Sequence, residues 1–325
     1  MTARNILIIK TSSLGDIVHM LPALTDASRQ QPGINIDWVV EENFAEVPRW
    51  HPSVGNILPV AIRRWRKHPF QQATWQEIQA FRQRLQRVPY DAIIDAQGLL
   101  KSALLAAFAR GKRYGYDRHS IREPLASFAY QQVFSVERQR HAITRNRLLL
   151  AHTLGYSIET LPLAHGIAQR TYPLPPVSLP TRYVVALHGT SRVDKEWSET
   201  HWQTLISGLA AQGISTVLPW GNAREQARAH RLAAACQSVQ VLPRSGLGEL
   251  AAIMQQAQGV IGMDTGLMHI AAALDKPGLA LYPVTQPSLT GVQGNSDSVN
   301  ALENLSGADT QDARAVTQRL LALLG

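Results

Sequence analysis

One short stretch places a carboxylate where a buried strand turns into a helix. "KTSSLGDIVHMLPAL" (10–24) follows the apolar run "NILIIK" directly. We expect Gly15 to supply a tight turn and Asp16 to enter the first helical turn, where the helix dipole keeps the carboxylate ionised. An ionised carboxylate that faces a cleft can accept a proton from a substrate hydroxyl. The alternative is an aspartate that only caps its own helix.

A second stretch, "GVIGMDTGLMHIAAALDKPGLALYP" (259–283), predicts a strand followed by a helix that opens at "DTG". The backbone N–H groups of Thr265 and Gly266 would lack intrahelical partners, and such a helix start binds anions. Asp264 would repel a phosphate, so it fits better as the N-cap or as an acceptor for neutral hydroxyls. The simpler alternative is a capped helix in an ordinary βα unit, with His269 merely packed or on the surface.

A third stretch, "LHGTSRVDKEWSETHW" (187–202), leaves a strand and reaches a helix start at Ser198. Thr190 and Ser191 offer hydroxyls to an anion, and Lys195 offers a point charge suited to phosphate. The alternative is a solvated loop whose lysine has no ligand.

Basic side chains gather in the first half of the chain. Residues 49–147 contain 18 Lys/Arg and 6 Asp/Glu, an excess of 12 positive charges. Such a field favours nucleic acid, anionic lipid or a phosphorylated substrate, and charge alone does not choose among them. The densest clusters, beside Trp65 and Tyr114, contain Arg63, Arg64, Arg66, Lys67 and Arg122. Arginine forks bind carboxylates and phosphates in two-point fashion.

Composition and the absence of several known motifs narrow the class of protein that this chain can be. The chain has 325 residues and a single cysteine, Cys236, which excludes an internal disulfide and a cysteine-based zinc site. We expect a cytosolic globular protein, because no apolar run is long enough to span a bilayer and no secretory signal opens the chain. The sequence lacks a P-loop, G-x-S-x-G, H-E-x-x-H and a D-x-D pair, so a bound diphosphate would depend on lysine and helix termini. "GLGELA" (246–251) follows a third strand, not the first, which makes it a poor dinucleotide fingerprint.

Strand-like and helix-like segments alternate along the chain, which predicts an α/β fold of two doubly wound, Rossmann-like parallel sheets facing a cleft. We expect five strands in each half, and helices in the first half at about 16–29, 75–88, 99–110 and 141–154. The proline-rich stretch 156–180 is expected to join the domains 1–165 and 166–325, and the last helix, about 312–324, can pack back on the first domain.

Taken together, these stretches resemble the bacterial heptosyltransferase I family of lipopolysaccharide core assembly, the ADP-heptose:lipid A–Kdo heptosyltransferases. The resemblance rests on "KTSSLGDIVHMLPAL", "DWVVEE", "AIRRWRK", "DAQGLLKSA", "REPLAS", "DKEW", "LPWG" and "MDTGLMHIAAALDKP", which occur in order over nearly the whole chain. "DTGLMH" alone would indicate only the wider heptosyltransferase family. The resemblance implies a GT-B glycosyltransferase whose first domain binds the acceptor and whose second binds ADP-heptose.

The resemblance also implies roles for individual residues. Asp16 would be the general base, and Lys195 would act on the departing ADP. The donor would be held by Thr190, Ser191, Lys195, Glu225, Asp264, Thr265, Gly266 and His269. The Kdo-lipid A acceptor would be held by Ser13, Gly15, Arg63, Arg66, Lys67, Lys101 and Arg122. Transfer would invert the anomeric centre with no metal and no cofactor beyond the donor substrate.

The resemblance further implies a monomer in peripheral contact with the anionic cytoplasmic face of the inner membrane, with no nucleic-acid partner. Two alternatives stay open. The first is a heptosyltransferase that acts on a heptose-terminated acceptor. The second is a non-enzymatic RNA-binding protein that uses residues 49–147, which would leave Asp16 and "DTGLMH" without a role.

Overall fold

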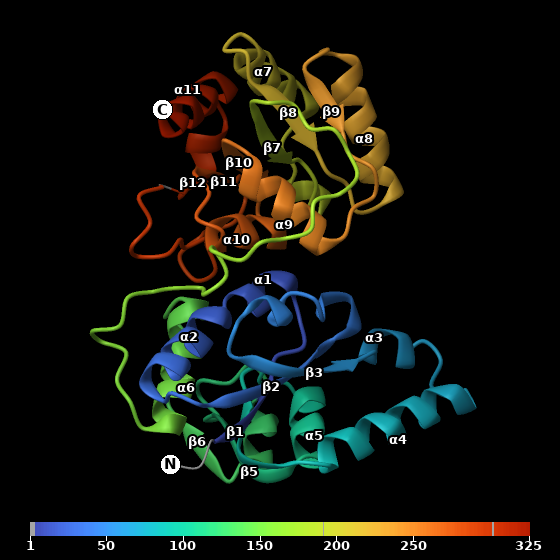
Figure 1. Cartoon of the computed structure of the whole chain (residues 1–325), viewed down its shortest axis with the longest axis vertical. Helices are drawn as coiled ribbons and strands as arrows, with labels where there is room; N and C mark the ends of the chain where they lie inside the picture. The colour runs from blue at the N-terminus through green and yellow to red at the C-terminus, as the bar shows by residue number, and fades with distance from the viewer. Residues whose placement is uncertain (1–3, 191, 301) are drawn as a thin grey trace. The chain divides into compact units, whose positions relative to one another are not determined.

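The computed structural model describes residues 4–190, 192–300 and 302–325. By its internal contacts the chain divides into two compact units, Met1–Gly166 and Ile167–Gly325. Each unit contains one six-stranded parallel sheet with helices packed on it (Figure 1).

The sheet of the first unit has the strand order β3-β2-β1-β4-β5-β6. Its strands are β1 (Asn5–Ile9), β2 (Asn35–Glu41), β3 (Val54–Val60), β4 (Pro89–Asp95), β5 (Arg110–Tyr116) and β6 (Gln132–Phe134). The central strand is almost wholly apolar, as expected of a parallel strand covered on both faces. Ile8 of β1 is fully buried and lies in register with Trp38 on one side and Ile94 on the other.

The helices of this unit are α1 (Leu14–Val18), α2 (Leu21–Gln30), α3 (Ile62–Trp65), α4 (Gln72–Gln86), α5 (Leu100–Phe108) and α6 (Ala142–Leu154). Short 3-10 turns, including η3 (Pro124–Ala129), complete it. The single helix predicted for 16–29 is wrong, because the segment forms two helices with a break after Val18. Pro22 explains the break, since its ring clashes with the carbonyl four residues earlier and it has no N–H to donate.

The sheet of the second unit has the order β12-β11-β10-β7-β8-β9. Numbered from the start of each unit, both sheets follow the order 3-2-1-4-5-6 of a Rossmann-like fold. The strands are β7 (Tyr183–Leu187), β8 (Ser215–Leu218), β9 (Val239–Val241), β10 (Gly259–Met263), β11 (Gly278–Tyr282) and β12 (Leu302–Ser306). The helices are α7 (Glu199–Ala210), α8 (Ala223–Ala234), α9 (Leu247–Gln256), α10 (Gly266–Ala273) and α11 (Ala313–Leu324).

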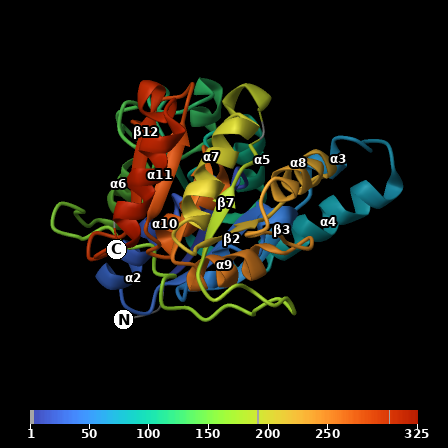
Figure 2. The ribbon, with the colours of Figure 1, turned by 90° about the horizontal axis from the view of Figure 1, so that it is seen from above.

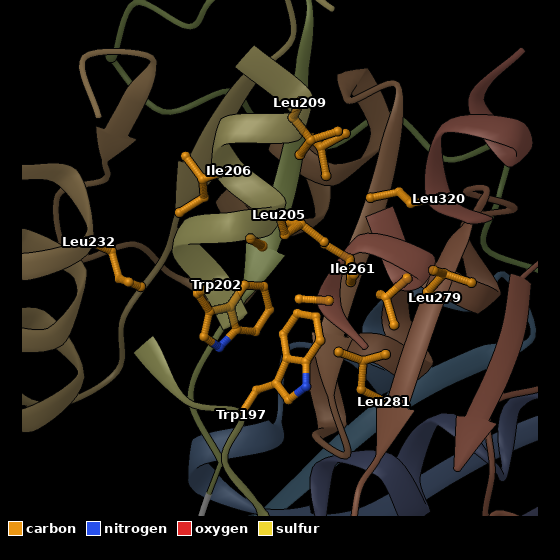
Figure 3. Packing of buried hydrophobic residues seen from close by; sticks show 14 of the residues in the cluster. Trp197, Trp202, Leu205, Ile206, Leu209, Leu232, Ile261, Leu279, Leu281 and Leu320 are labelled. Carbon is orange, nitrogen blue, oxygen red and sulfur yellow. The ribbon is translucent and has the colours of Figure 1, made fainter. Parts of the chain in front are cut away.

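The core of the second unit lies between its sheet and the helices α7 and α11. Trp202 and Leu205 of α7 pack with Leu279 and Leu281 of β11 (Figure 3). The last helix, α11, lies beside α7 and contributes Leu320 to this core (Figure 2). The terminal helix therefore packs within its own unit.

The sequence predicts five strands in each half, and the structure adds one edge strand to each sheet, β6 and β12. Between Leu154 and Tyr183, a stretch described throughout, neither helix nor strand forms. Within the described part of the chain, no helix combines the length and the apolar content that a membrane crossing requires.

Candidate active site

Asp16 lies at the carboxyl end of β1, the strand at which the order of the first sheet reverses. Ligands of doubly wound sheets bind outside the strand ends at this switch point. Asp16 is the third residue of α1, as predicted for the first helical turn. The tight-turn role predicted for Gly15 is wrong: Gly15 is the buried second residue of α1 and has no positive φ, because the chain turns earlier, at residues 10–13.

The two carboxylate oxygens of Asp16 have different surroundings. Its Oδ2 accepts hydrogen bonds from the Ser13 backbone N–H at 2.7 Å and from the Ser13 hydroxyl at 3.0 Å. Its Oδ1 lies 3.8 Å from the Nζ atom of Lys10. The Asp16 side chain retains 38% of its surface exposed, so it is oriented by the protein and still accessible to a ligand. Asp16 thus caps its helix with one oxygen and leaves the other available.

Lys10 is a buried lysine beside this carboxylate. Its Nζ donates to the Ala96 carbonyl at 3.0 Å, and its own carbonyl accepts from the Trp38 indole at 2.9 Å. Burial lowers the pKa of Lys10, while the nearby carboxylates of Asp16 and Asp95 act in the opposite direction. "KTSSLGD" contains Lys10, but nothing in the sequence shows that this lysine is buried against the aspartate.

The loop 10–13 is bound to both neighbouring strands. The Gln97 side-chain carbonyl, just after β4, accepts from the backbone N–H groups of Thr11 and Ser12 at 2.9 and 3.1 Å. On the other side, the Glu41 N–H, at the end of β2, donates to the Thr11 carbonyl at 3.1 Å. The ends of three adjacent strands are therefore hydrogen bonded together around Asp16.

This same edge of the sheet brings two of the predicted acceptor-binding arginines near the loop. The Arg63 N–H donates to Glu41 Oε1 at 2.9 Å, and its guanidinium lies 5.5 Å from the centre of the Phe44 ring. Arg122 is exposed, and the next residue, Glu123, donates its N–H to the Gly98 carbonyl at 3.2 Å. Arg122 is also close enough to lower the pKa of Lys10 electrostatically.

The remaining basic candidates are more dispersed. Arg66, Lys67 and Lys101 are exposed, the first two at the end of α3 and the third on α5. Arg64, which shares their cluster, pairs with Glu42 at 3.1 Å and with Glu77 at 2.8 Å. These ion pairs of Arg64 hold α3 against α4.

In the second unit, Lys195 and Asp264 form an ion pair at the switch point of the sheet. The Nζ atom of Lys195 lies 2.7 Å from Asp264 Oδ2, and the Thr285 hydroxyl donates to the same oxygen at 3.3 Å. Asp264 follows β10 and Lys195 follows β7, the strands between which the order reverses. The carboxylate that would repel a phosphate is thus neutralised by the lysine that would attract one.

Asp264 is not the N-cap of α10, as one interpretation of the sequence had it. Thr265 occupies that position in extended conformation, and Gly266 is the first helical residue. The other interpretation, an acceptor for neutral hydroxyls, agrees with the Thr285 contact. Thr190 is buried and its hydroxyl donates to the Asp264 carbonyl at 3.4 Å. His269 is also buried and lies within α10. Ser191 lies outside the described residues.

The two residues that follow Lys195 are buried or ion-paired and fix the position of its loop. Glu196 pairs with Arg228 at 2.8 Å and with Arg224 at 2.6 Å. The Trp197 ring is buried in the core, lies edge-on to Trp202 with ring centres 5.3 Å apart, and donates its indole N–H to the Thr310 carbonyl at 2.7 Å (Figure 3). The loop that carries Lys195 is therefore anchored in the sheet core.

Glu225 lies in the first turn of α8, the helix that follows the neighbouring strand β8. Its Oε2 accepts from the Gly221 N–H and its Oε1 from the Asn222 side chain, both at 2.7 Å. A Cβ atom at Gly189 would approach the Glu225 carboxyl carbon to 2.8 Å, so the loop after β7 passes directly against Glu225 because residue 189 is glycine. Among residues 4–190, 192–300 and 302–325, no three or more His, Cys, Asp or Glu side chains form a group that could hold a metal ion.

Two Rossmann-like units in one chain are the architecture of the GT-B glycosyltransferases, and the family match below assigns the chain to that class. The family model described as "Glycosyltransferase family 9 (heptosyltransferase)" matches residues 78–319, and the chain belongs to this family.

Individual relatives extend this similarity to nearly the full chain. "Lipopolysaccharide heptosyltransferase 1" of Escherichia coli K12 is 46% identical over 324 residues, covering 98% of this chain and 99% of the relative. The solved structure of E. coli heptosyltransferase WaaC with ADP superposes with a TM-score of 0.91 at 44% identity, covering 98% of this chain and 99% of the other. The same enzyme with ADP-2-deoxy-2-fluoro heptose superposes with a TM-score of 0.87, with the same identity and coverage.

Proposed function

We propose that this heptosyltransferase moves L-glycero-D-manno-heptose from ADP-heptose to the inner Kdo of Kdo-lipid A during synthesis of the lipopolysaccharide inner core. The observation that carries this proposal is the full-length similarity to E. coli WaaC, which has been solved with ADP and with a fluorinated ADP-heptose analogue. The acceptor, the inversion of the anomeric centre and the absence of a metal are parts of the proposal.

Asp16 is the general base of the proposed reaction. The acceptor hydroxyl must lose its proton as its oxygen attacks the anomeric carbon, and a positioned carboxylate can receive that proton. The two Ser13 hydrogen bonds hold Asp16 Oδ2, which leaves Oδ1 for the proton. The Nζ atom of Lys10 lies 3.8 Å from Oδ1, beside the oxygen that would receive the proton.

The second unit holds the donor in this proposal. As the bond to the anomeric carbon breaks, ADP gains negative charge that Lys195 and the N–H groups of Thr265 and Gly266 stabilise. The anchoring of the Lys195 loop supports this role, because catalytic stabilisation of charge needs groups already held in place. Thr190, Ser191, Glu225, Asp264 and His269 complete the proposed donor site. Glu225 offers acceptor oxygens for the hydroxyl groups of the donor.

The first unit takes the acceptor in this proposal. Kdo carries a carboxylate and lipid A carries phosphates, and the exposed basic side chains match that charge. The proposed acceptor-binding set consists of Ser13, Gly15, Arg63, Arg66, Lys67, Lys101 and Arg122. The enzyme acts as a monomer in peripheral contact with the anionic cytoplasmic face of the inner membrane, where each lysine or arginine contributes about 1 kcal/mol of attraction.

The decisive experiment measures ADP release from ADP-heptose with de-acylated Kdo-lipid A, with and without EDTA. We expect acceptor-dependent release that EDTA does not change, and a product whose new linkage has the opposite anomeric configuration by NMR. Release only with a heptose-terminated acceptor would replace the acceptor assignment. Loss of activity in EDTA that returns with a divalent cation would refute the metal-free reaction. No release with either acceptor, together with salt-sensitive RNA binding, would refute the enzyme assignment.

A further inference from the structure

Helix α5 has an apolar face toward solvent, which a helix on the surface of a soluble protein normally lacks. Ser102, Ala103, Leu105 and Ala106 form its buried side. The opposite side carries Leu100 and Leu104, one helical turn apart, with 50% and 58% of their surfaces exposed. Lys101 is the single charged residue of the helix. A helix that is apolar on all sides is normally buried or in contact with lipid.

A second exposed apolar element, the 3-10 turn η3, packs against α5. Leu125 and Phe128 lie three residues apart and therefore on one side of the turn. Their surfaces are 66% and 79% exposed. The two elements are joined by hydrogen bonds, since the Leu100 N–H donates to Glu123 Oε2 at 2.7 Å and the Glu123 N–H donates to the Gly98 carbonyl.

The charge around these side chains is strongly positive. Between residues 97 and 134 the sequence has six Lys/Arg and two Asp/Glu. One of the two acidic residues, Glu123, accepts a hydrogen bond from the Leu100 N–H at the start of α5. The basic residues of this region are Lys101, Arg110, Lys112, Arg113, Arg118 and Arg122. Apolar side chains within a basic surround suit the interface of an anionic bilayer, where both contributions act together.

We propose that Leu100, Leu104, Leu125 and Phe128, hereafter the α5–η3 face, insert into the interfacial region of an anionic phospholipid bilayer. This inference rests on the proposed function, in which the acceptor is a lipid. It adds to that function which surface touches the membrane, and that the contact is apolar as well as electrostatic.

The position of this face relative to Asp16 supports the inference. The loop that leads into α5 contains Gln97, whose side chain binds the Thr11 and Ser12 N–H groups just before Asp16. Arg122, a proposed acceptor-binding residue, directly precedes Glu123 at the start of η3. A sugar attached to a lipid in the bilayer beneath the α5–η3 face would thus lie next to the proposed base.

The test measures binding of the full chain to sedimenting vesicles of phosphatidylethanolamine with phosphatidylglycerol. The double variant Leu104→Gln/Phe128→Gln keeps every charge and removes two of the inserting side chains. We expect its partition coefficient to fall by on the order of tenfold or more, because each buried leucine or phenylalanine contributes substantially. The matched control is Leu174→Gln/Val299→Gln, which changes two exposed apolar residues of the second unit and should bind like the wild type.

Three results would overturn the inference. The first is unchanged vesicle binding by a folded Leu104→Gln/Phe128→Gln. The second is loss of binding in Phe70→Gln/Trp75→Gln instead, since these exposed aromatic residues lie before and on α4. The third is a wild-type dimer that the α5–η3 substitutions dissociate without affecting vesicle binding, which would make the face a contact between two copies of the chain.

Turnover separates this inference from the proposed function. The α5–η3 variant should turn over de-acylated acceptor at the wild-type rate and lose activity only on acceptor embedded in vesicles. A wild type that binds vesicles through this face but transfers no heptose to either acceptor would refute the proposed function and leave the docking surface standing. Equal loss on both acceptors would refute the docking role.

Discussion

The Asp16 carboxylate both caps α1 and faces solvent, and one substitution separates these roles. Asp16→Asn keeps an oxygen for the Ser13 N–H but removes the basic oxygen. We expect kcat to fall by about 10²–10⁴-fold, the usual contribution of a positioned base. ADP binding, measured by calorimetry, should stay unchanged because the proposed donor-binding residues belong to the second unit.

A matched control for this prediction is Asp312→Asn. Asp312 caps α11 by accepting from the N–H groups of Arg314 and Ala315, and we assign it no role in the reaction. Its variant should show a comparable small change in melting temperature and full turnover. If Asp16→Asn also retains full turnover, another group removes the proton.

The prediction for Lys195 concerns how its positive charge offsets the negative charge of Asp264. Lys195→Ala removes the cation and leaves the Asp264 carboxylate unpaired by it at the proposed site of the donor diphosphate. ADP affinity should fall by about 10–100-fold, the worth of a hydrogen bond to a charged group. Adding Asp264→Asn should restore part of that affinity, because it removes the remaining repulsion. Calorimetry with ADP measures both variants, and Arg192→Ala, a cation of the same loop paired with Asp194, is the control. A double variant that binds no better than Lys195→Ala would contradict this account.

The sequence predicts Asp16 and Lys195 because each lies next to a strand end and a helix start, which are local features. The Lys10–Asp16 contact and the Lys195–Asp264 pair were not predictable in the same way. The first depends on how deeply a lysine is buried, and the second joins residues 69 positions apart in the chain. The buried lysine below the proposed base therefore became apparent only in three dimensions.

At the scale of the element, the short turn η4 (Val193–Lys195) depends on the tryptophan that follows it. Trp197→Ala should lower the free energy of unfolding of the second unit by about 3–5 kcal/mol, as large-to-small changes in a core do. It should also weaken ADP binding, because it removes the anchor of Lys195. Trp197→Phe retains an aromatic ring in the core but removes the indole donor from the Thr310 carbonyl, so a smaller cost of about 1–3 kcal/mol is expected.

Urea unfolding and ADP calorimetry check this prediction together. Trp75→Phe is the control, since its indole also donates to a backbone carbonyl, that of Pro69, but on the exposed surface of the first unit. The anchoring role would be refuted if Trp197→Ala unfolded more easily yet bound ADP with the wild-type affinity.

The elements themselves follow from the sequence where their apolar pattern is long. The predicted helices 75–88, 99–110 and 141–154 are confirmed as α4, α5 and α6 to within three residues at each end. The edge strands β6 and β12 were missed because one has three residues and the other, "LENLS", is mostly polar. Their pairing with β5 and β11 depends on a sheet edge already in place, which no local pattern indicates.

At the scale of the whole molecule, the alternation of strands and helices suffices to predict two parallel sheets of the same fold. Each unit also contains a neutral buried histidine, His51 or His188. Burial lowers the pKa of each to about 4, aided at His51 by the charge of His165 and at His188 by that of Arg228. His51 Nδ1 accepts from the Ser53 N–H at 3.2 Å, so its Nε2 carries the proton donated to Thr25.

Both units should therefore lose stability in mild acid. Below a pH of about 6.5 the unfolded chain takes up protons at these positions while the folded chain does not, so the free energy of unfolding falls as pH falls. The loss continues until the folded pKa of about 4 and reaches about 3 kcal/mol for each histidine. Calorimetric melting between pH 7.5 and 5 should show both transitions moving down. His51→Gln should reduce the pH dependence of the melting temperature of the first unit alone, and His188→Gln that of the second unit. His230→Gln changes an exposed histidine of α8 and should reduce neither pH dependence. A pH dependence that survives in both buried-histidine variants would assign it to other groups.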